Sequence, residues 1–212
     1  MKQLAISGFV VTLCTCAVGQ PSDWTPVTPE LAEALRTGGL PAAAKLVGHY
    51  VGGEEADSNV GVLDLADLAR VSTVVVMARV TGKFPARLRT INIITTDYQL
   101  EVTDWFQGPF VNGQDLKVQM LGGRVRFSDG TTAEWREVRN PFLKLNTEYL
   151  FFLERFLDED VYVPSVGTQS IFGFTAEGKV VSWARAQDEV FKKYSGLSRE
   201  SFLAQVRASV IP

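Results

Sequence analysis

Three cationic side chains that lie close together in the sequence offer the clearest possibility of ligand chemistry. Lys83, Arg87 and Arg89 lie in a predicted loop at 82–90, which follows an apolar, β-branched run. Cations grouped beside aromatic rings are typical of surfaces that hold nucleic acid or sugar, and Trp105 and Trp135 could provide the rings. Further arginines could extend a basic face: Arg124, Arg126, Arg136 and Arg139. The three cations and two tryptophans are the candidate ligand-binding residues, although tryptophans also commonly close a core or cover a barrel mouth.

Carboxylates offer a second kind of chemistry. Asp97, Glu101 and Asp104 fall in one strand candidate, but no histidine accompanies them, and outward positions of a strand explain the first two. The Asp-Glu-Asp run at 158–160 could help to bind calcium, but no glycine-spaced series of ligands supports it. The single histidine, His49, is interpreted as a surface or packing residue. The sequence therefore assigns no catalytic residue and no metal ligand, and we expect no cofactor.

The first nineteen residues have the pattern of a secretory signal peptide. Lys2 precedes an apolar run at 4–18, which is shorter than a membrane-spanning helix, and small side chains stand before the expected cut after Gly19. Both cysteines, Cys14 and Cys16, lie in this run. We therefore expect an extracytoplasmic protein, periplasmic or secreted. The alternative is a lipoprotein tethered to the membrane through Cys16.

Composition narrows the function further. About 190 residues remain after residue 19, enough for one domain with a sizeable core. The formal net charge of −3 gives no overall attraction for nucleic acid or anionic lipid. We expect no nucleic-acid partner, and contact with a membrane only if Cys16 is lipidated.

The pattern of elements predicts a mainly β fold. Residues 20–62 read as a leader with short helices, in which Thr28 caps a helix that ends at Gly38-Gly39 and 52–59 form a polar loop. Residues 63–185 contain about six to seven strands with turn residues between them, typical of an antiparallel, OB-like β-barrel. The alternation of the long strand candidate 91–106 slips near its end, which predicts a bulge. Asp129-Gly130 predicts a hairpin, because both residues tolerate a positive φ. Residues 186–212 form a helical extension packed on the barrel, with Ser198 as its cap.

Several segments within the barrel region resemble a broad set of uncharacterised exported bacterial proteins. They are Leu68 through Val80, Tyr98 through Val102, Phe106 through Gly108, Val118 through Gly123, and Asn140 through Leu153. That set is similar to the OB-type barrel of netrin-like modules and tissue inhibitors of metalloproteinases. The chain departs from the pattern at Gln107, where lysine is usual, and at Asn146, where glycine is usual. Asparagine tolerates a left-handed turn, so the expected fold is unchanged.

The Cys14-Thr15-Cys16 sequence looks like the Cys-x-Cys start of metalloproteinase inhibitors, whose terminal amine and carbonyl bind the target's zinc. That start would need cleavage before Cys14, after the bulky Leu13, and partner cysteines that the chain does not contain. The sequence favours an exported, non-enzymatic binding or interaction module whose partner is a protein or glycan of the cell envelope. The alternatives are a carboxylate-type hydrolase and a protease-inhibitor-like barrel that acts through a loop.

Overall fold

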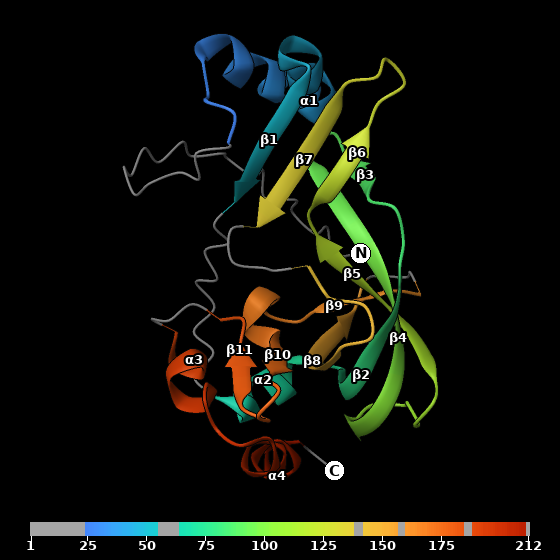
Figure 1. Ribbon diagram of the computed structural model, residues 1–212, viewed down its shortest axis with the longest axis vertical. Coiled ribbons are helices and arrows are strands. Elements are labelled where there is room, and N and C mark those ends of the chain that lie inside the picture. The colour runs from blue at the N-terminus through green and yellow to red at the C-terminus, as the bar shows by residue number, and fades with distance from the viewer. Residues whose placement is uncertain (1–23, 55–63, 138–141, 157–159, 185–187, 211–212) are drawn as a thin grey trace, which may run out of the picture.

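The computed structural model describes residues 24–54, 64–137, 142–156, 160–184 and 188–210. The expected export segment 1–19 and its two cysteines lie outside these ranges, as do Arg139, Asp158 and Glu159. Figure 1 shows the barrel and three helices in the lower part of the molecule and a small sheet with α1 in the upper part. The long strand β4 runs between the two parts.

Five strands close into a barrel, in the order β8-β2-β4-β5-β9 with β9 pairing back to β8. Their bounds are β2 (Val74–Lys83), β4 (Ile93–Gln107), β5 (Asp115–Leu121), β8 (Glu148–Arg155) and β9 (Tyr162–Pro164). The β5–β9 pair is parallel and the other pairs in the barrel are antiparallel. A closed five-stranded barrel with one parallel pair of strands among antiparallel pairs is the OB-type architecture. The predicted mainly β, OB-like fold with flanking helices is therefore confirmed, with five strands closing the barrel and further strands extending it.

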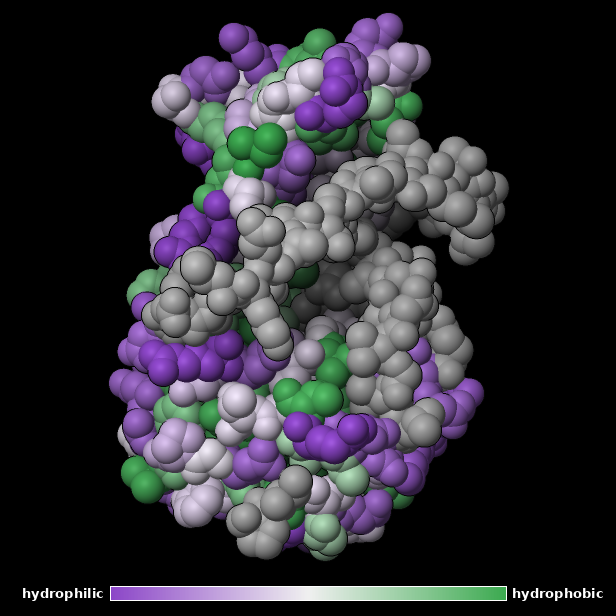
Figure 2. All heavy atoms as spheres, turned by 180° about the vertical axis from the view of Figure 1, so that it is seen from behind, coloured by the Kyte–Doolittle hydropathy of each residue, from purple (hydrophilic) through white to green (hydrophobic). Residues whose placement is uncertain are grey.

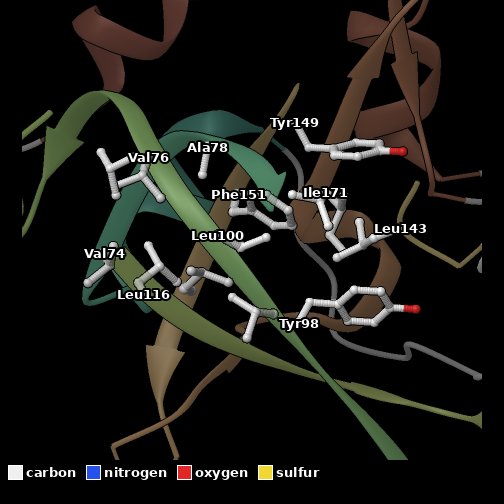
Figure 3. Packing of buried hydrophobic residues seen from close by; sticks show 14 of the residues in the cluster. Val74, Val76, Ala78, Tyr98, Leu100, Leu116, Leu143, Tyr149, Phe151 and Ile171 are labelled. Atoms are coloured by element: carbon white, nitrogen blue, oxygen red, sulfur yellow. The ribbon is translucent and has the colours of Figure 1, made fainter. Parts of the chain in front are cut away.

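Strand β2 is buried on both faces over its first five residues. Val74, Val76 and Ala78 belong to the cluster inside the barrel, together with Tyr98 and Phe151 (Figure 3). The two residues that alternate with these three, Val75 and Met77, belong to a second cluster outside the barrel. Side chains alternate across a strand, so an unbroken apolar run needs a packed layer on each side.

The long strand β4 contains the predicted bulge. Val75 pairs with Gln107 and Val76 with Trp105, so Phe106 is left without an opposing residue. A second slip follows between Met77 and Ala78. Because each bulge increases local twist, β4 can curve around the barrel at one end and extend past it at the other.

Tyr98 lies inside the barrel with its hydroxyl buried, and within the described residues the hydroxyl has no hydrogen-bond partner. Burial, followed by the effect of Tyr149, raises the pKa of Tyr98 to about 12. The unfolded pKa is about 10, so the folded state holds this proton more tightly. The resulting contribution to stability is complete below pH 10 and is lost as the pH rises through 12.

We therefore predict that Tyr98→Phe is as stable as the wild type at pH 7 or more stable by about 1 kcal/mol, because it removes an unpaired buried hydroxyl. At pH 11 the wild type should lose about 1 kcal/mol more than the variant, relative to pH 7. Urea unfolding at the two pH values measures both effects. Identical pH dependence of the two proteins would contradict the assignment.

The upper part contains β1 (His49–Glu54), β7 (Thr132–Glu137) and β6 (Gly123–Arg126), in the order β1-β7-β6. Strand β1 runs parallel to β7, which corrects the prediction that a polar loop begins at Gly52. A Cβ atom at Gly53 would collide with the backbone oxygen of Arg136 and the ring of Trp24, so this glycine permits a close approach rather than a turn. The hairpin predicted at Asp129-Gly130 joins β6 to β7.

Helix α1 (Pro29–Val47) covers this small sheet and is kinked at Gly39, as the predicted break at Gly38-Gly39 requires. Thr28 caps it, because its Oγ1 accepts a hydrogen bond of 3.2 Å from the Leu31 amide. Leu31 and Leu40 are buried with Tyr50 and Ile94 in a third apolar cluster. The upper sheet, α1 and the extended part of β4 therefore share one core.

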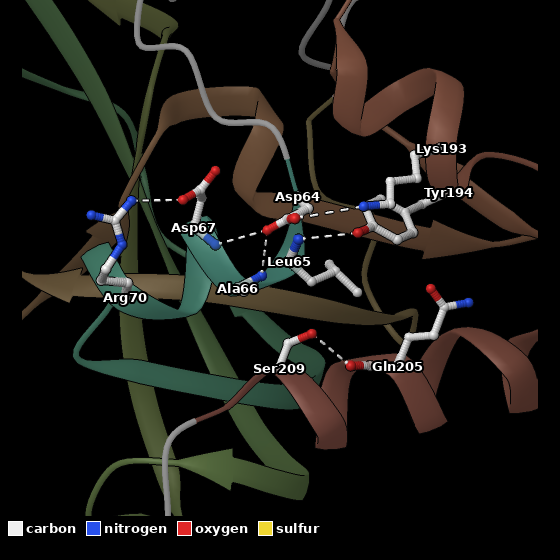
Figure 4. Close-up of polar contacts among 9 residues, drawn as sticks. All are labelled: Asp64, Leu65, Ala66, Asp67, Arg70, Lys193, Tyr194, Gln205 and Ser209. Atoms are coloured by element: carbon white, nitrogen blue, oxygen red, sulfur yellow. Dashed lines mark hydrogen bonds and ion pairs between the residues drawn. The ribbon is translucent and has the colours of Figure 1, made fainter.

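Three helices cover the outside of the barrel: α2 (Leu65–Val71), α3 (Glu189–Tyr194) and α4 (Arg199–Ser209). Asp64 caps α2 and lies 3.6 Å from Lys193, while the Tyr194 hydroxyl accepts a hydrogen bond from the Leu65 amide (Figure 4). These contacts join α2 to α3. The predicted cap of α4 is also present, since Ser198 accepts a hydrogen bond from the Ser201 amide.

Each end of α4 is fixed to the barrel by an arginine. Arg199 bonds Glu148 at 2.9 Å, and Arg207 bonds Asp104 at 3.0 Å. Burial raises the pKa of Glu148, but the hydrogen bond from Arg199 and the charges of Arg199 and Arg79 outweigh it, so the pKa lies below its usual value. Glu148 therefore stays ionised at neutral pH and keeps α4 attached.

The remaining elements extend the barrel sheet beyond the closed barrel, beside β4 and beside β8. They are β3 (Arg87–Thr90), which pairs with β4, β10 (Ile171–Phe174) and β11 (Val180–Ser182), with a 3-10 turn at Gly167–Ser170. In the part of the chain that the structure describes, no helix is long and apolar enough to cross a membrane. Figure 2 shows the side turned away in Figure 1, where hydrophilic and hydrophobic residues are interspersed among the coloured atoms.

Candidate ligand-binding face

Alternate residues of β4 and β5 point away from the barrel and form one polar surface. Tyr98, Leu100 and Val118 are inside, so their neighbours face outward. The outward residues pair across the strands: Thr95 with Leu121, Asp97 with Gln119, and Gln99 with Lys117. We call these six residues the outer β4–β5 face. The β2–β4 connection, which contains β3, and Phe156 at the end of β8 border it.

An ion pair lies at the centre of this face. Strand β3 places Arg87 opposite Thr95, and the Arg87 guanidinium lies 3.1 Å from Asp97 Oδ2. Gln119 Nε2 donates a 2.9 Å hydrogen bond to Asp97 Oδ1. Asp97, Gln119 and Thr95 are buried, whereas half of the Arg87 side chain is exposed. The buried Thr95 hydroxyl has no hydrogen-bond partner among the described residues. The exposed guanidinium of Arg87 therefore lies beside buried polar side chains.

Cations stacked on phenylalanine rings surround the ion pair. Lys117 Nζ lies 5.4 Å from the centre of the Phe84 ring, and the Arg89 guanidinium lies 4.6 Å from that of Phe156. Phe84 follows β2, and Phe156 follows β8, so the second pair joins β3 to the end of β8. A cation on a ring is partly desolvated and fixed in position, which prepares it for an anionic group.

Lys83 lies on the other side of the same connection. It is opposite Tyr98 in the register and therefore points inward, with Nζ 4.5 Å from the centre of the Phe142 ring and 5.7 Å from that of Tyr98. The sequence placed Lys83, Arg87 and Arg89 in one loop. The structure instead ends β2 at Lys83 and places both arginines in β3. The two arginines border the outer β4–β5 face, and Lys83 borders the end of the barrel.

The structure does not bring the two candidate tryptophans to this face. Trp105 is exposed and lies eight residues beyond Asp97 along β4, which is ~25 Å at the usual rise of a strand. Trp135 belongs to β7 and packs against the apolar core of the upper part. The rings found at the face are Phe84 and Phe156, which the sequence analysis did not select.

The other arginine candidates belong to the upper sheet. Arg124 and Arg136 both pair with Glu134, at 3.9 and 2.6 Å, and Arg126 is exposed at the end of β6. His49 is also exposed there, and its Nδ1 atom lies 2.5 Å from Thr132 Oγ1. The Arg124–Glu134 and His49–Thr132 contacts join neighbouring strands, which is consistent with the packing interpretation of His49.

The carboxylate candidates are separated from one another. Asp97 and Glu101 lie four residues apart on one strand, ~13 Å along its axis. Asp104 lies further along and is paired with Arg207. Glycoside hydrolysis by two carboxylates requires a separation of ~5–10 Å, which Asp97 and Glu101 exceed, while Asp104 is held in an ion pair with Arg207. Among the described residues no group of three or more histidine, cysteine, aspartate or glutamate residues could hold a metal ion.

No protein-family model matches this chain. A search of curated protein sequences likewise finds no match. Functional interpretation therefore depends on the geometry described above.

The central ion pair gives a prediction about stability. Asp97→Asn and Arg87→Gln should each destabilise the protein by about 1 kcal/mol, since Asp97 is buried but Arg87 is half exposed and screened by water. The double variant should lose less than the sum, with a coupling of about 1 kcal/mol. Urea unfolding of the four proteins measures this coupling. Strict additivity would mean that the ion pair does not form in solution.

Proposed function

We propose that this protein is an exported, non-enzymatic binding module of the OB type, which recognises a protein or glycan of the cell envelope through the outer β4–β5 face. The observation that carries the proposal is the group of stacked and paired cations, Arg87, Arg89 and Lys117, beside the outer strands β4 and β5. In OB-type barrels the equivalent strands and connections commonly bind ligands. The resemblance to netrin-like modules and the export signal form part of the same proposal.

A binding role suits this chemistry better than catalysis does. Asp97 is already ion-paired with Arg87 and accepts a hydrogen bond from Gln119, so both of its oxygen atoms help to hold the face together. The nearest carboxylate on the same strand face, Glu101, is too distant to act with it in hydrolysis. Catalysis of this kind requires two carboxylates that act together, whereas cations fixed on aromatic rings can bind an anion without any catalytic group.

The experiment uses protein purified after expression of the full chain and measures its retention on envelope extract. The double variant Phe84→Leu/Arg89→Gln should be retained at least fivefold less than the wild type. Val181→Ala is the matched control, because Val181 is similarly exposed but lies on β11. Equal retention of all three proteins would refute the assignment to this face. Turnover of glycan, ester or peptide substrates without retention would refute the binding role.

The proposed location predicts a specific amino terminus. Mass spectrometry of the protein from its native cells should show that residues 1–19 have been removed and that the chain begins at Gln20. Lipid on Cys16 would indicate the tethered alternative. Cytosolic protein that retains Met1 would contradict export.

A further inference from the structure

Strand β1 forms one border of the small upper sheet, whose order is β1-β7-β6 (Figure 1). Trp24 and Thr25, which precede α1 in the sequence, are attached to the outer side of β1. The Thr25 amide donates a 2.9 Å hydrogen bond to the Val51 oxygen, and Thr25 Oγ1 accepts one of 2.8 Å from the Val51 amide. We call Trp24 and Thr25 the N-terminal strap, because these bonds fasten them across the edge of the sheet.

The strap uses only part of the hydrogen-bonding capacity of this edge. The Thr132 amide of β7 donates to the Gly48 oxygen, and alternate residues of β1 therefore face β7. His49, Val51 and Gly53 lie between them and direct their backbone groups outward. Among the described residues, only Val51 has hydrogen-bond partners on that side. The backbone groups of the other two residues are available to a longer strand.

The strap shows which side chains fit the edge. A Cβ atom at Gly53 would lie 2.8 Å from an atom of the Trp24 ring, so the indole packs directly on the backbone of this glycine. The Thr25 hydroxyl takes the place of a neighbouring strand's carbonyl as acceptor for the Val51 amide. An extended peptide with an aromatic residue followed by serine or threonine reproduces both contacts.

The strap cannot lengthen its own pairing with β1. Pro26 follows it directly and has no amide to donate, and Thr28 already caps α1. Both strap residues are partly exposed, so little buried area holds them in place. A peptide that continues as a strand gains hydrogen bonds beside Val51 that the strap does not make, and it can therefore displace the strap.

We propose that the edge of β1 binds an extended peptide of another protein, in which an aromatic residue is followed by serine or threonine, and that this peptide replaces the strap. Main-chain hydrogen bonds along β1 provide the affinity, and the aromatic ring on Gly53 provides the specificity. This surface is separate from the outer β4–β5 face. The proposal therefore stands or falls independently of the function proposed for that face.

The test measures equilibrium binding of a fluorescein-labelled peptide to the full-chain protein. The peptide is Ser-Asp-Trp-Thr-Val-Val-Thr, the sequence of residues 22–28 with valine in place of proline. Trp24→Ala/Thr25→Ala removes the strap's contacts and should bind the peptide at least tenfold more tightly than the wild type, because the strap no longer competes for the edge. Val27→Ala is the matched control, since Val27 is exposed next to the strap and should leave affinity unchanged.

Amide hydrogen exchange locates the bound peptide. In the free protein the edge-facing amides of His49 and Gly53 should exchange faster than that of Val51, which the strap protects. Saturation with the peptide should slow exchange at both of them. A second peptide, with alanine in place of its tryptophan and threonine, should bind at least tenfold more weakly to the wild type and to the double variant.

Three results would overturn the proposal: no gain in affinity in the double variant, equal binding of the two peptides, or unchanged exchange at His49 and Gly53. If thermal unfolding shows that the double variant does not fold, the preference of the wild type for the first peptide and the exchange data decide the matter alone. Self-association of the double variant in sedimentation, in place of peptide binding, would assign the edge to a second copy of the chain and refute the peptide partner.

Discussion

Phe202→Ala should destabilise the protein by about 4 kcal/mol, the largest effect that we expect of a single truncation in the C-terminal region. Phe202 is fully buried between α4 and the barrel. Its ring lies 4.9 Å from that of Phe172, 5.8 Å from that of Tyr194 and 6.4 Å from that of Phe174, measured between centroids. Truncation therefore removes buried apolar area and leaves a cavity where three elements meet. Urea unfolding followed by far-UV circular dichroism measures the loss.

Gln205→Ala is the matched control for this prediction. Gln205 is exposed on the same helix, so its replacement should change stability by no more than about 0.5 kcal/mol. If Phe202→Ala costs no more than this control, α4 does not pack on the barrel in solution. The C-terminal helix would then be an independent appendage rather than part of the barrel's outer layer.

Gly39→Ala should destabilise the protein by about 3 kcal/mol. Gly39 has a φ of 66° at the kink of α1, a backbone conformation that side chains disfavour by about 1–2 kcal/mol. An added Cβ atom would lie 2.2 Å from the Ile91 backbone oxygen, which also accepts a hydrogen bond from the Leu40 amide. Overpacking of this kind costs a further 1–3 kcal/mol, roughly. The substitution therefore separates α1 from the β3–β4 turn.

Gly48→Ala is the control, because Gly48 also has a positive φ, 77°, but a Cβ atom there would meet nothing within 4 Å. It should cost only the backbone term, about 1 kcal/mol. Thermal or urea unfolding of the two variants separates backbone strain from steric collision. Equal losses would mean that α1 does not approach Ile91 as described.

Local patterns in the sequence predicted the parts of the fold that depend on neighbouring residues. The caps at Thr28 and Ser198, the turn at Asp129-Gly130 and the slip in β4 are confirmed because each arises within a few residues. Strand β1 was missed because it contains two glycines and is stabilised by parallel pairing with β7, about eighty positions away. Such a partner leaves no local signal. The helical extension predicted at 186–212 contains two helices, α3 and α4, and their separation at the Gly196 turn depends on contacts with α2 and β11.

The candidate site could be predicted only in part. Arg87 and Arg89 were selected from the sequence, and Lys117 could have been, because it lies between the inward residues Leu116 and Val118. The sequence could not show that Trp105 and Trp135 lie away from the ligand-binding face. The alternation of apolar and polar residues indicates which side of a strand a residue lies on, but it does not indicate which strands become neighbours. The approach of Phe156 to Arg89 depends on how the barrel closes between β5, β9 and β8.

Site-specific crosslinking tests the binding face most directly. A photoreactive phenylalanine analogue is introduced at Phe84, at the edge of the outer β4–β5 face, or at Val181, which is similarly exposed on β11. After irradiation in envelope extract, the protein labelled at position 84 should become covalently joined to a discrete partner, and the protein labelled at 181 should not. Crosslinking at 181 alone, or equally at both positions, would contradict a binding role for this face.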